Sequence, residues 1–303
     1  MRLSNSQGMK AFQIGYKVIL PQLKRKDYKV KCLSLLNNSC KLKVFLYFNS
    51  INHKSIKMRK SLFITLLLAF NLSFAQVYTM HGVRVLPENQ ELFEKIETKY
   101  VSKVAQNAVN EGKMLGWGLI KINQGIGENE GFNYVFVNSY KDIDQMNQNN
   151  NWWSNTEKVL GIEPDVLFRN LIEESARYFY KQQMEIQGNS PSKYVAFFFG
   201  KANNINEYLK IEKIWFGWHK KNMSKIGMTA WGVGTKFLPV NRKQSSNVMT
   251  WNLFDKKADI MRFVAGEDFG TSQMPKTNAA EIMPKGWENI VIGEILSFTS
   301  PKK

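Results

Sequence analysis

Cysteine and histidine are scarce in this chain of 303 residues, which contains 2 cysteines and 3 histidines. Both cysteines, Cys32 and Cys40, lie within the first 75 residues. If that region is removed, as argued below, the remaining chain cannot form disulfides, use a thiolate nucleophile or bind a metal through cysteine. The chain also lacks a Gly-x-Ser-x-Gly motif, a Walker loop and a dinucleotide-binding fingerprint, so none of those enzyme classes is indicated.

Acidic residues are almost absent from the same region. Residues 1–75 contain 14 lysines and arginines and one acid, Asp27, whereas residues 76–303 contain 28 basic and 24 acidic residues. The formal charge of +17 therefore belongs mostly to the first 75 residues, and the rest of the chain carries +4. A charge this small predicts no nucleic-acid partner, because such partners are attracted by concentrated basic surface.

The stretch "MRKSLFITLLLAFNLSFAQ" over residues 58–76 has the layout of a secretory signal peptide. It begins with two basic residues and continues as an uncharged apolar run that is too short to span a membrane comfortably. It ends in Ser73-Phe74-Ala75, with small residues at the two positions that a signal peptidase reads. Cleavage of residues 58–75 predicts a periplasmic or extracellular protein. No membrane anchor is expected after cleavage, because position 76 is not a cysteine that could be lipidated.

Residues 1–57 precede this signal. We interpret them either as an upstream extension that the native protein lacks, with Met58 the true start, or as an unusually long leader. A cytoplasmic N-terminal domain is disfavoured, because this segment is strongly basic, shows no sustained hydrophobic period and is short for a core of its own.

The rest of the chain contains one pattern twice. The stretch "ELFEKIETKYVSKVAQNAVNEGKMLGWG" is followed later by "NEYLKIEKIWFGWHKKNMSKIGMTAWG". Glu97 matches Glu212 at an offset of 115 residues, and Trp117 matches Trp231 at an offset of 114. A chance similarity would not hold its offset across separate positions. We therefore infer two copies of one structural unit, about 115 residues long.

Each copy predicts a strand, a helix, two strands joined by a polar loop, a second helical region and a closing strand. In the first copy the helix ends at Gly112, and the strands are expected over 76–86, 114–122, 132–140 and 178–186. In the second copy the helix ends at Gly227, and the strands are expected over 193–200, 228–238, 247–254 and 289–299.

This β-α-β-β-α-β order is that of the ferredoxin-like unit. Two such units in one chain resemble the dimeric α+β barrel superfamily, in which two units pack their sheets face to face. The resemblance covers most of residues 77–300 and implies an α+β fold of tandem repeats, 76–190 and 191–303, that form the barrel within one chain. Antibiotic-biosynthesis-type monooxygenases, haem-degrading enzymes and stress-responsive barrels are similar in architecture, and their chemistries differ too much for membership to assign a function.

The resemblance also implies a cavity between each sheet and its helices, which makes polar residues on the inner helix faces candidates for a site. Glu212 and His219 are seven residues apart, about two helical turns, on one side of the second copy's helix. We regard them as the candidate catalytic pair, because burial would raise the pKa of the glutamate and suit it to proton transfer. The alternative is a structural role, which the recurrence of Glu97 in the first copy favours.

Histidine marks a difference between the copies. Val104 stands in the first copy near the place of His219, as expected if one of two sites degenerated after duplication. His81 is the only other histidine after residue 75. Because no close ligand spacing such as His-x-x-x-His occurs, we predict no metal or cofactor, and haem ligation by His219 stays open.

Aromatic residues complete the expected site. The candidate ligand-binding residues are Glu97, Trp117, Tyr208, Trp215, Trp231 and Trp251. We interpret the Trp-rich stretch "NWWSN" as core packing or a lid over the cavity rather than an exposed stacking surface.

The leading interpretation is a secreted or periplasmic protein that binds a small, largely apolar ligand in an aromatic cavity. One alternative is a cofactor-light oxygenase or isomerase that uses Glu212 and His219, and another is a structural or interaction module without a ligand. The chain is expected to act as a monomer with an internal pseudo-dimer, or as a homo-oligomer.

We predict that the exported protein begins at Gln76, because Ala75 closes the cleavage motif. Intact mass spectrometry of the protein recovered from the periplasm or the medium should give the mass of residues 76–303. A mass that still includes residues 58–75 would contradict the signal peptide.

Overall fold

The structure is a computed structural model, and it describes residues 76–124, 131–149, 151–167, 170–188, 192–240 and 246–301. The predicted signal peptide and the segment before it lie outside these residues, so export stays a prediction. Within the described ranges, no helix combines the length and the apolar character that crossing a membrane requires.

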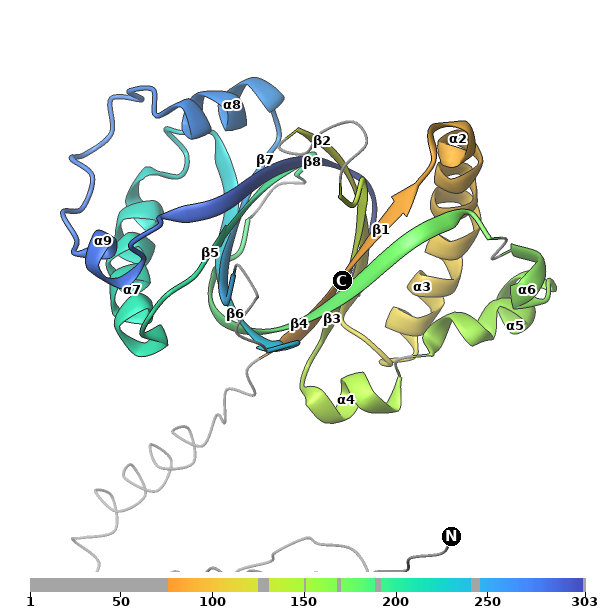
Figure 1. The fold of residues 1–303 in the computed structure, drawn as a ribbon. Helices are drawn as coiled ribbons and strands as arrows, with labels where there is room; N and C mark the ends of the chain where they lie inside the picture. The colour runs from red at the N-terminus through yellow and green to blue at the C-terminus, as the bar shows by residue number, and fades with distance from the viewer. Residues whose placement is uncertain are drawn as a thin grey trace, which may run out of the picture. The chain divides into compact units, whose positions relative to one another are not determined.

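The first unit has the predicted β-α-β-β-α-β order (Figure 1). Its strands are β1 (Val77–Val85), β2 (Gly116–Gln124), β3 (Tyr134–Tyr140) and β4 (Ile172–Ile186). One long helical segment joins β1 to β2 and consists of α2 (Pro87–Ile96), the π-helical turn η1 (Glu97–Val101) and α3 (Ser102–Asn110). Shorter helices lead from β3 to β4, namely α4 (Ile143–Gln148), η2 (Trp152–Asn155), α5 (Thr156–Leu160) and α6 (Pro164–Leu167).

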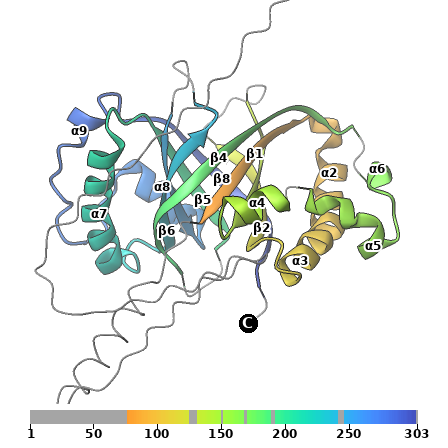
Figure 2. The same ribbon diagram turned by 90° about the horizontal axis from the view of Figure 1, so that it is seen from below.

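The second unit repeats this order. Its strands are β5 (Tyr194–Gly200), β6 (Met228–Leu238), β7 (Val248–Phe254) and β8 (Trp287–Thr299). Its helices are α7 (Ile205–Asn222), α8 (Lys257–Ala265) and α9 (Ala279–Ile282). The helices of the two units lie outside the strands, on opposite sides of the molecule, as Figures 1 and 2 both show.

The eight strands form one closed barrel in the order β1-β3-β2-β8-β5-β7-β6-β4. Within each unit the strands pair antiparallel, and two further antiparallel pairs, β2 with β8 and β4 with β6, join the units. The chain therefore has the dimeric α+β barrel fold with both halves in one polypeptide. The predicted fold class, tandem ferredoxin-like repeats in an intrachain barrel, is confirmed.

Local sequence explains where the main helices begin and end. The side chain of Asn204 accepts hydrogen bonds from the backbone amides of Asn206 and Glu207, which are otherwise unpaired at the start of α7. Gly112 and Gly227 follow the two long helices with φ of 69° and 70°. This left-handed conformation is open to glycine without steric cost. The first helix ends at Asn110, close to Gly112 as predicted. The second ends at Asn222, five residues before Gly227, so its predicted end was wrong, and a turn leads from there to the glycine.

Two further elements, a helical turn and a strand, differ from the prediction. The first unit's long helix contains the π-helical turn η1, which begins at Glu97. The strand expected over 178–186 begins at Ile172 instead, because its first part pairs with β1 and its second part pairs with β6. A strand that pairs with strands of both units must be long. The pattern of one repeat does not predict which strand of the other unit it pairs with.

Alternation along the strands divides the buried side chains into three clusters. One lies between the first unit's sheet and its helices, the second lies in the equivalent place in the second unit, and the third fills part of the barrel interior. In β6, Trp231 and Val233 belong to the helix-side cluster. Gly232 and Gly234 therefore face the interior, since neighbouring residues of a strand point to opposite faces.

These two glycines make room for large aromatic rings at one end of the interior. A Cβ atom on Gly232 would overlap the ring of Trp251, and one on Gly234 would overlap the hydroxyl of Tyr78. The ring of Tyr78 stacks on Tyr180 at a centroid distance of 5.4 Å and meets Trp251 edge to face, also at 5.4 Å. The side chains at this end of the barrel are therefore close-packed.

We predict that Gly234→Ala lowers the free energy of unfolding by roughly 1–3 kcal/mol, because Tyr78 has to move within a packed interior. The same substitution at Gly217 is the matched control. Gly217 lies on the exposed side of α7, and a Cβ atom there meets nothing within 4 Å. Gly217→Ala should raise the unfolding free energy by roughly 0.5–1 kcal/mol through helix propensity. Urea denaturation measures both, and equal effects of the two substitutions would contradict the packing described here.

Candidate functional site

A cavity of about 300 Å³ lies between α7 and the outer face of the second unit's sheet. Residues at helical spacing on α7 form one wall, namely Tyr208, Ile211, Glu212, Trp215, Trp218 and His219. Strands β6 and β7 provide Trp231, Thr250 and Asn252, and the segment around α9 covers the outside. The face of α7 that packs on the sheet is thus also the face that carries the two candidate catalytic groups.

His219 is packed among tryptophans and is only 4% exposed. Its ring centroid lies 5.0 Å from that of Trp231 and 5.2 Å from that of Trp218. Its Nδ1 atom is buried and has no hydrogen-bond partner among the described residues. Burial lowers the pKa of this histidine to about 4. The imidazole is therefore neutral at neutral pH, with one nitrogen that donates and one that accepts hydrogen bonds.

Glu212 is equally buried, at 5% exposure. Burial raises the pKa of its carboxyl to about 7, although Tyr208, one turn earlier on α7, lowers it in part. The Tyr208 hydroxyl makes no hydrogen bond of regular geometry. It therefore acts on Glu212 through the dipole of its O–H group. Near neutral pH the carboxyl is therefore present in both protonation states, as proton transfer requires.

Glu212 and His219 contact different parts of the cavity. Seven residues along a helix correspond to a rise of about 10 Å, which is too far for a direct hydrogen bond between the two side chains. A molecule that contacts both groups has to extend along α7 by about that distance. Aromatic side chains line the space between them, including Trp215 and Trp231. The arrangement suits a flat, apolar body with a polar group at one or both ends.

The structure brings five of the expected site residues together at this cavity, namely Tyr208, Glu212, Trp215, His219 and Trp231. Trp251 lies on the other face of the sheet, where its ring packs against Tyr78 inside the barrel. Its neighbours Thr250 and Asn252 line the cavity in its place. Glu97 and Trp117 belong to the first unit, in the equivalent region between sheet and helices.

In the first unit this region is filled by tryptophan. Trp152 is 6% exposed and packs edge to face against Trp117, at a centroid distance of 6.5 Å. In the second unit, Trp231 packs against His219, which comes from the long helix and not from the segment after the third strand. Of the two uses predicted for "NWWSN", core packing is thus correct for Trp152. A lid over a cavity, the other use predicted for this stretch, stays a prediction.

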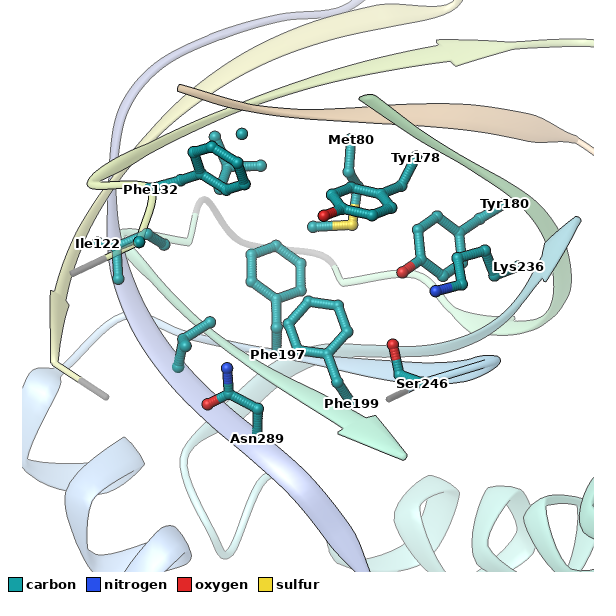
Figure 3. Close-up of a pocket in the computed structure, with 14 residues that line it drawn as sticks. Met80, Ile122, Phe132, Tyr178, Tyr180, Phe197, Phe199, Lys236, Ser246 and Asn289 are labelled. Atoms are coloured by element: carbon teal, nitrogen blue, oxygen red, sulfur yellow. The ribbon is translucent and has the colours of Figure 1, made fainter. Parts of the chain in front are cut away.

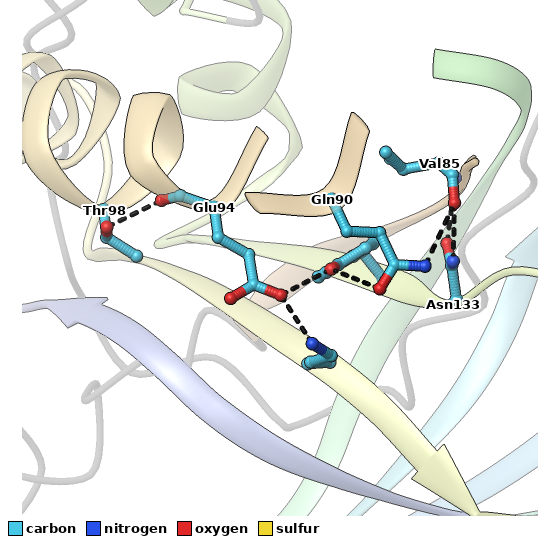
Figure 4. A network of polar contacts seen from close by, with 7 residues as sticks. Val85, Gln90, Glu94, Thr98 and Asn133 are labelled. Carbon is cyan, nitrogen blue, oxygen red and sulfur yellow. Dashed lines mark hydrogen bonds and ion pairs between the residues drawn. The ribbon is translucent and has the colours of Figure 1, made fainter. Parts of the chain in front are cut away.

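Glu97 shares the burial of Glu212. It is 5% exposed, one of its carboxyl oxygens has no hydrogen-bond partner among the described residues, and burial raises its pKa to about 8. Glu94, one turn earlier, shows what a paired glutamate looks like in the same helix (Figure 4). It accepts hydrogen bonds from Lys121 at 2.7 Å and from Tyr134 at 2.6 Å. Although desolvation acts to raise the pKa of Glu94, these bonds outweigh it and lower that pKa.

Sequence reasoning missed several residues of the cavity wall, including Trp218, Trp287 and Asn252. Trp218 precedes His219 on α7, and the helical period alone would have placed both near the same face. Asn252 lies two residues after Thr250 in a predicted strand, and strand alternation would have placed both on one face. Trp287 begins β8, and its position beside α7 depends on contacts that are distant in the sequence.

No group of three or more histidine, cysteine, aspartate or glutamate side chains in the described part of the chain could hold a metal ion. Haem ligation by His219 is limited by space. A volume of about 300 Å³ is at the lower end for ligand sites and suits two or three fused rings rather than a tetrapyrrole.

Comparisons with known proteins give a distant likeness of fold. No family model matches the sequence, and no curated protein matches it. Among solved structures, a protein from Fusobacterium nucleatum subsp. nucleatum described as a "putative monooxygenase" has a TM-score of 0.49 and 9% identity, over 75% of this chain and 94% of that one. A heme-binding protein from Thermus thermophilus has a TM-score of 0.42 and 10% identity, over 73% of this chain and 91% of that one.

A chlorite dismutase mutant from Candidatus Nitrospira defluvii has a TM-score of 0.41 and 10% identity, over 76% of this chain and 94% of that one. At this distance the likenesses carry no conclusion about what this chain binds or does. The fold assignment rests on the chain's own strand order.

We predict that Glu212→Gln removes a loss of stability at high pH. The folded-state pKa of about 7 is above the usual 4.5, so the folded protein keeps a proton that the unfolded chain releases. The contribution of the protonated carboxyl to the unfolding free energy is fully present below about pH 4.5, and it is lost as the pH rises through 7. Relative to wild type, the variant should therefore gain roughly 3 kcal/mol more unfolding free energy at pH 8 than at pH 4.

Chemical denaturation of both proteins at the two pH values measures this gain. His219 acts in the opposite direction between its lowered pKa of about 4 and its usual 6.5, but it is the same in both proteins and cancels. Glu207→Gln, which changes a partly exposed glutamate paired with Lys210 in the first turn of α7, is the control and should show no such gain. A pH-independent effect of Glu212→Gln would mean that this carboxyl is not held protonated by burial.

Proposed function

We propose that the second unit binds a small, flat, largely apolar ligand that carries a hydroxyl or carbonyl group, in the cavity between α7 and the sheet. The observation that carries this proposal is the combination of aromatic walls with two buried titratable side chains: Glu212, which Tyr208 contacts, and His219, whose Nδ1 has no hydrogen-bond partner among the described residues. Unpaired buried polar groups cost stability, so their presence is typical of a site that a ligand completes.

Each polar group has a distinct role in this proposal. The neutral ring of His219 accepts a hydrogen bond from a ligand hydroxyl while its faces remain packed on tryptophan. Glu212 donates a hydrogen bond when protonated and accepts one when ionised. The tryptophan rings contribute the apolar contacts, which are favourable for a flat ring system in offset or edge-to-face arrangement.

A second candidate function is catalysis by the same pair, as in a cofactor-light oxygenase or an isomerase. The observation that favours it is the pKa of about 7 for Glu212 at the cavity wall, since a group that exchanges protons near the working pH makes an efficient acid or base. In an oxygenase, Glu212 or His219 would take the proton of a phenol. Molecular oxygen would then supply one oxygen atom to the ring and the other to water.

We also propose that the protein acts after export, as its predicted signal peptide indicates, and as a monomer. Support for a monomer comes from the closed barrel, whose described strands all have two neighbours and leave no sheet edge for a second copy. Sedimentation equilibrium of the mature chain distinguishes a monomer from a homo-oligomer.

We predict that 1-naphthol, a two-ring phenol, binds the wild-type protein and binds His219→Phe about tenfold more weakly. Phenylalanine keeps the ring packing on Trp231 and removes the nitrogen that accepts the hydroxyl. The matched control is His81→Phe, which changes the other described histidine, a residue of β1 beside Phe136 in the first unit. Isothermal titration calorimetry measures the affinities, and equal weakening by both substitutions would contradict the site.

The same mixture separates binding from catalysis. A binder returns 1-naphthol unchanged. An oxygenase converts 1-naphthol and O₂ into 1,4-naphthoquinone and water, which chromatography with mass detection reveals, and Glu212→Gln should then abolish the product.

A further inference from the structure

A second cavity of about 440 Å³ lies inside the barrel, on the opposite face of the sheet from the site just described (Figure 3). Both units contribute to its wall. Met80, Ile122 and Tyr178 come from the first unit, and Phe197, Phe199 and Lys236 come from the second. The resemblance to known barrels predicted cavities only on the helix side of each sheet, so this space was not expected.

The cavity lies towards one end of the barrel. Towards the other end, the packed rings of Tyr78 and Trp251 occupy the interior, and Tyr180, which stacks on Tyr78, also lines the cavity. Phe132 and Ser246 line the cavity, and each lies beside the hairpin connection of its unit, β2 to β3 and β6 to β7. Strands β2 and β6 run in the same direction, since four successive antiparallel pairs separate them. The two hairpins therefore lie at the same end of the barrel.

Lys236 is the one basic side chain among the described residues that line this cavity. It follows Gly232 and Gly234 at a spacing of two along β6, which directs it to the interior. Its Nζ atom lies 5.4 Å from the centre of the Tyr178 ring. In Figure 3 the amine points towards Tyr180 and Ser246. No ion pair within the described ranges involves Lys236, so its charge meets only an aromatic face and hydroxyl groups.

This arrangement leaves a cation without a countercharge in a largely aromatic space. Burial lowers the pKa of Lys236, and the nearby charge of Lys201 lowers it further. Both effects disfavour a positive charge there, and an anion beside the amine would oppose them by favouring the charged form. The hydroxyls of Tyr180 and Ser246, which interact with each other, can donate to the same anion.

We propose that the barrel interior is a binding site for a small aromatic monocarboxylate. The carboxylate accepts hydrogen bonds from Lys236 and from the Tyr180 or Ser246 hydroxyl, and the ring lies against Phe197 and Phe199. A single lysine with hydroxyl neighbours matches one negative charge better than the two charges of a phosphate monoester. This site is independent of the proposed function, because the sheet separates its wall from α7.

Cinnamate and cinnamyl alcohol test the proposal as a matched pair, since they share a ring and a chain and differ in the charged group. Isothermal titration calorimetry with the mature protein should show that cinnamate binds more tightly than the alcohol. In Lys236→Met, which keeps the length of the side chain and removes the charge, cinnamate should bind at least about tenfold more weakly. The affinity for cinnamyl alcohol should stay within about twofold, and Lys236→Arg should restore most of the cinnamate affinity.

Two controls locate the binding. Lys213→Met removes a lysine from the exposed side of α7 and should leave cinnamate binding unchanged. Ala279→Trp places a large side chain of α9 in the cavity under α7, and it should also leave cinnamate binding unchanged. The proposal is overturned if wild-type protein does not bind cinnamate at millimolar concentration, if Lys236→Met and Lys213→Met weaken it equally, or if Ala279→Trp abolishes it. Far-ultraviolet circular dichroism confirms that each variant is folded before titration.

Discussion

The architecture depends on two long strands that each pair with both units. β4 pairs with β1 of its own unit and with β6 of the other, and β8 pairs with β5 and with β2 in the same way. These pairings turn two four-stranded sheets into one closed barrel. Closure gives every strand an interior face and a helix-covered face. Successive residues of a strand therefore point alternately into the barrel and towards the helices. Trp251 packs in the interior, for example, while its neighbours Thr250 and Asn252 line the cavity under α7.

Duplication explains the likeness of the two units, and a few substitutions explain their difference. Both units keep a buried glutamate on the long helix, Glu97 or Glu212, and a buried tryptophan on the following strand, Trp117 or Trp231. In the first unit a third large ring, that of Trp152, packs against this tryptophan. In the second unit the smaller imidazole of His219 takes that role. The second unit's region retains a cavity that places its glutamate and histidine on one wall.

The element order, the duplication and the end of the first long helix could be predicted because they depend on local signals. Hydrophobic period indicates which face of an element is buried, and Gly112 indicated the end of the first long helix, whereas α7 ends five residues before Gly227. The grouping of Glu212, His219, Trp215 and Trp231 followed from the same helical period, with the superfamily resemblance supplying the sheet against which they pack. The roles assigned to these residues stay proposals, since placement alone tests none of them.

Other features depend on pairings between distant segments and were beyond reach. The early start of β4 at Ile172 reflects its partners in two sheets, and the burial of Trp152 depends on how a short 3₁₀ turn folds back on Trp117. The interior cavity could be predicted only once the barrel was known to close, because Tyr178, Phe199 and Lys236 come together only inside the closed barrel. Alternation on β5, in the run "YVAFFFG", could have shown that Phe197 and Phe199 share a face, but not what faces them.

The cavity under α7 is proposed to hold a ligand, whereas in the equivalent region of the first unit Trp152 packs against Trp117. The most direct test is native mass spectrometry of the gently purified mature protein, compared with its denatured mass. The account predicts extra mass, of the size of a two- or three-ring organic molecule, that is lost on denaturation and is absent from Ala279→Trp. Identical native and denatured masses in the wild-type protein, or extra mass that Ala279→Trp retains, would contradict it.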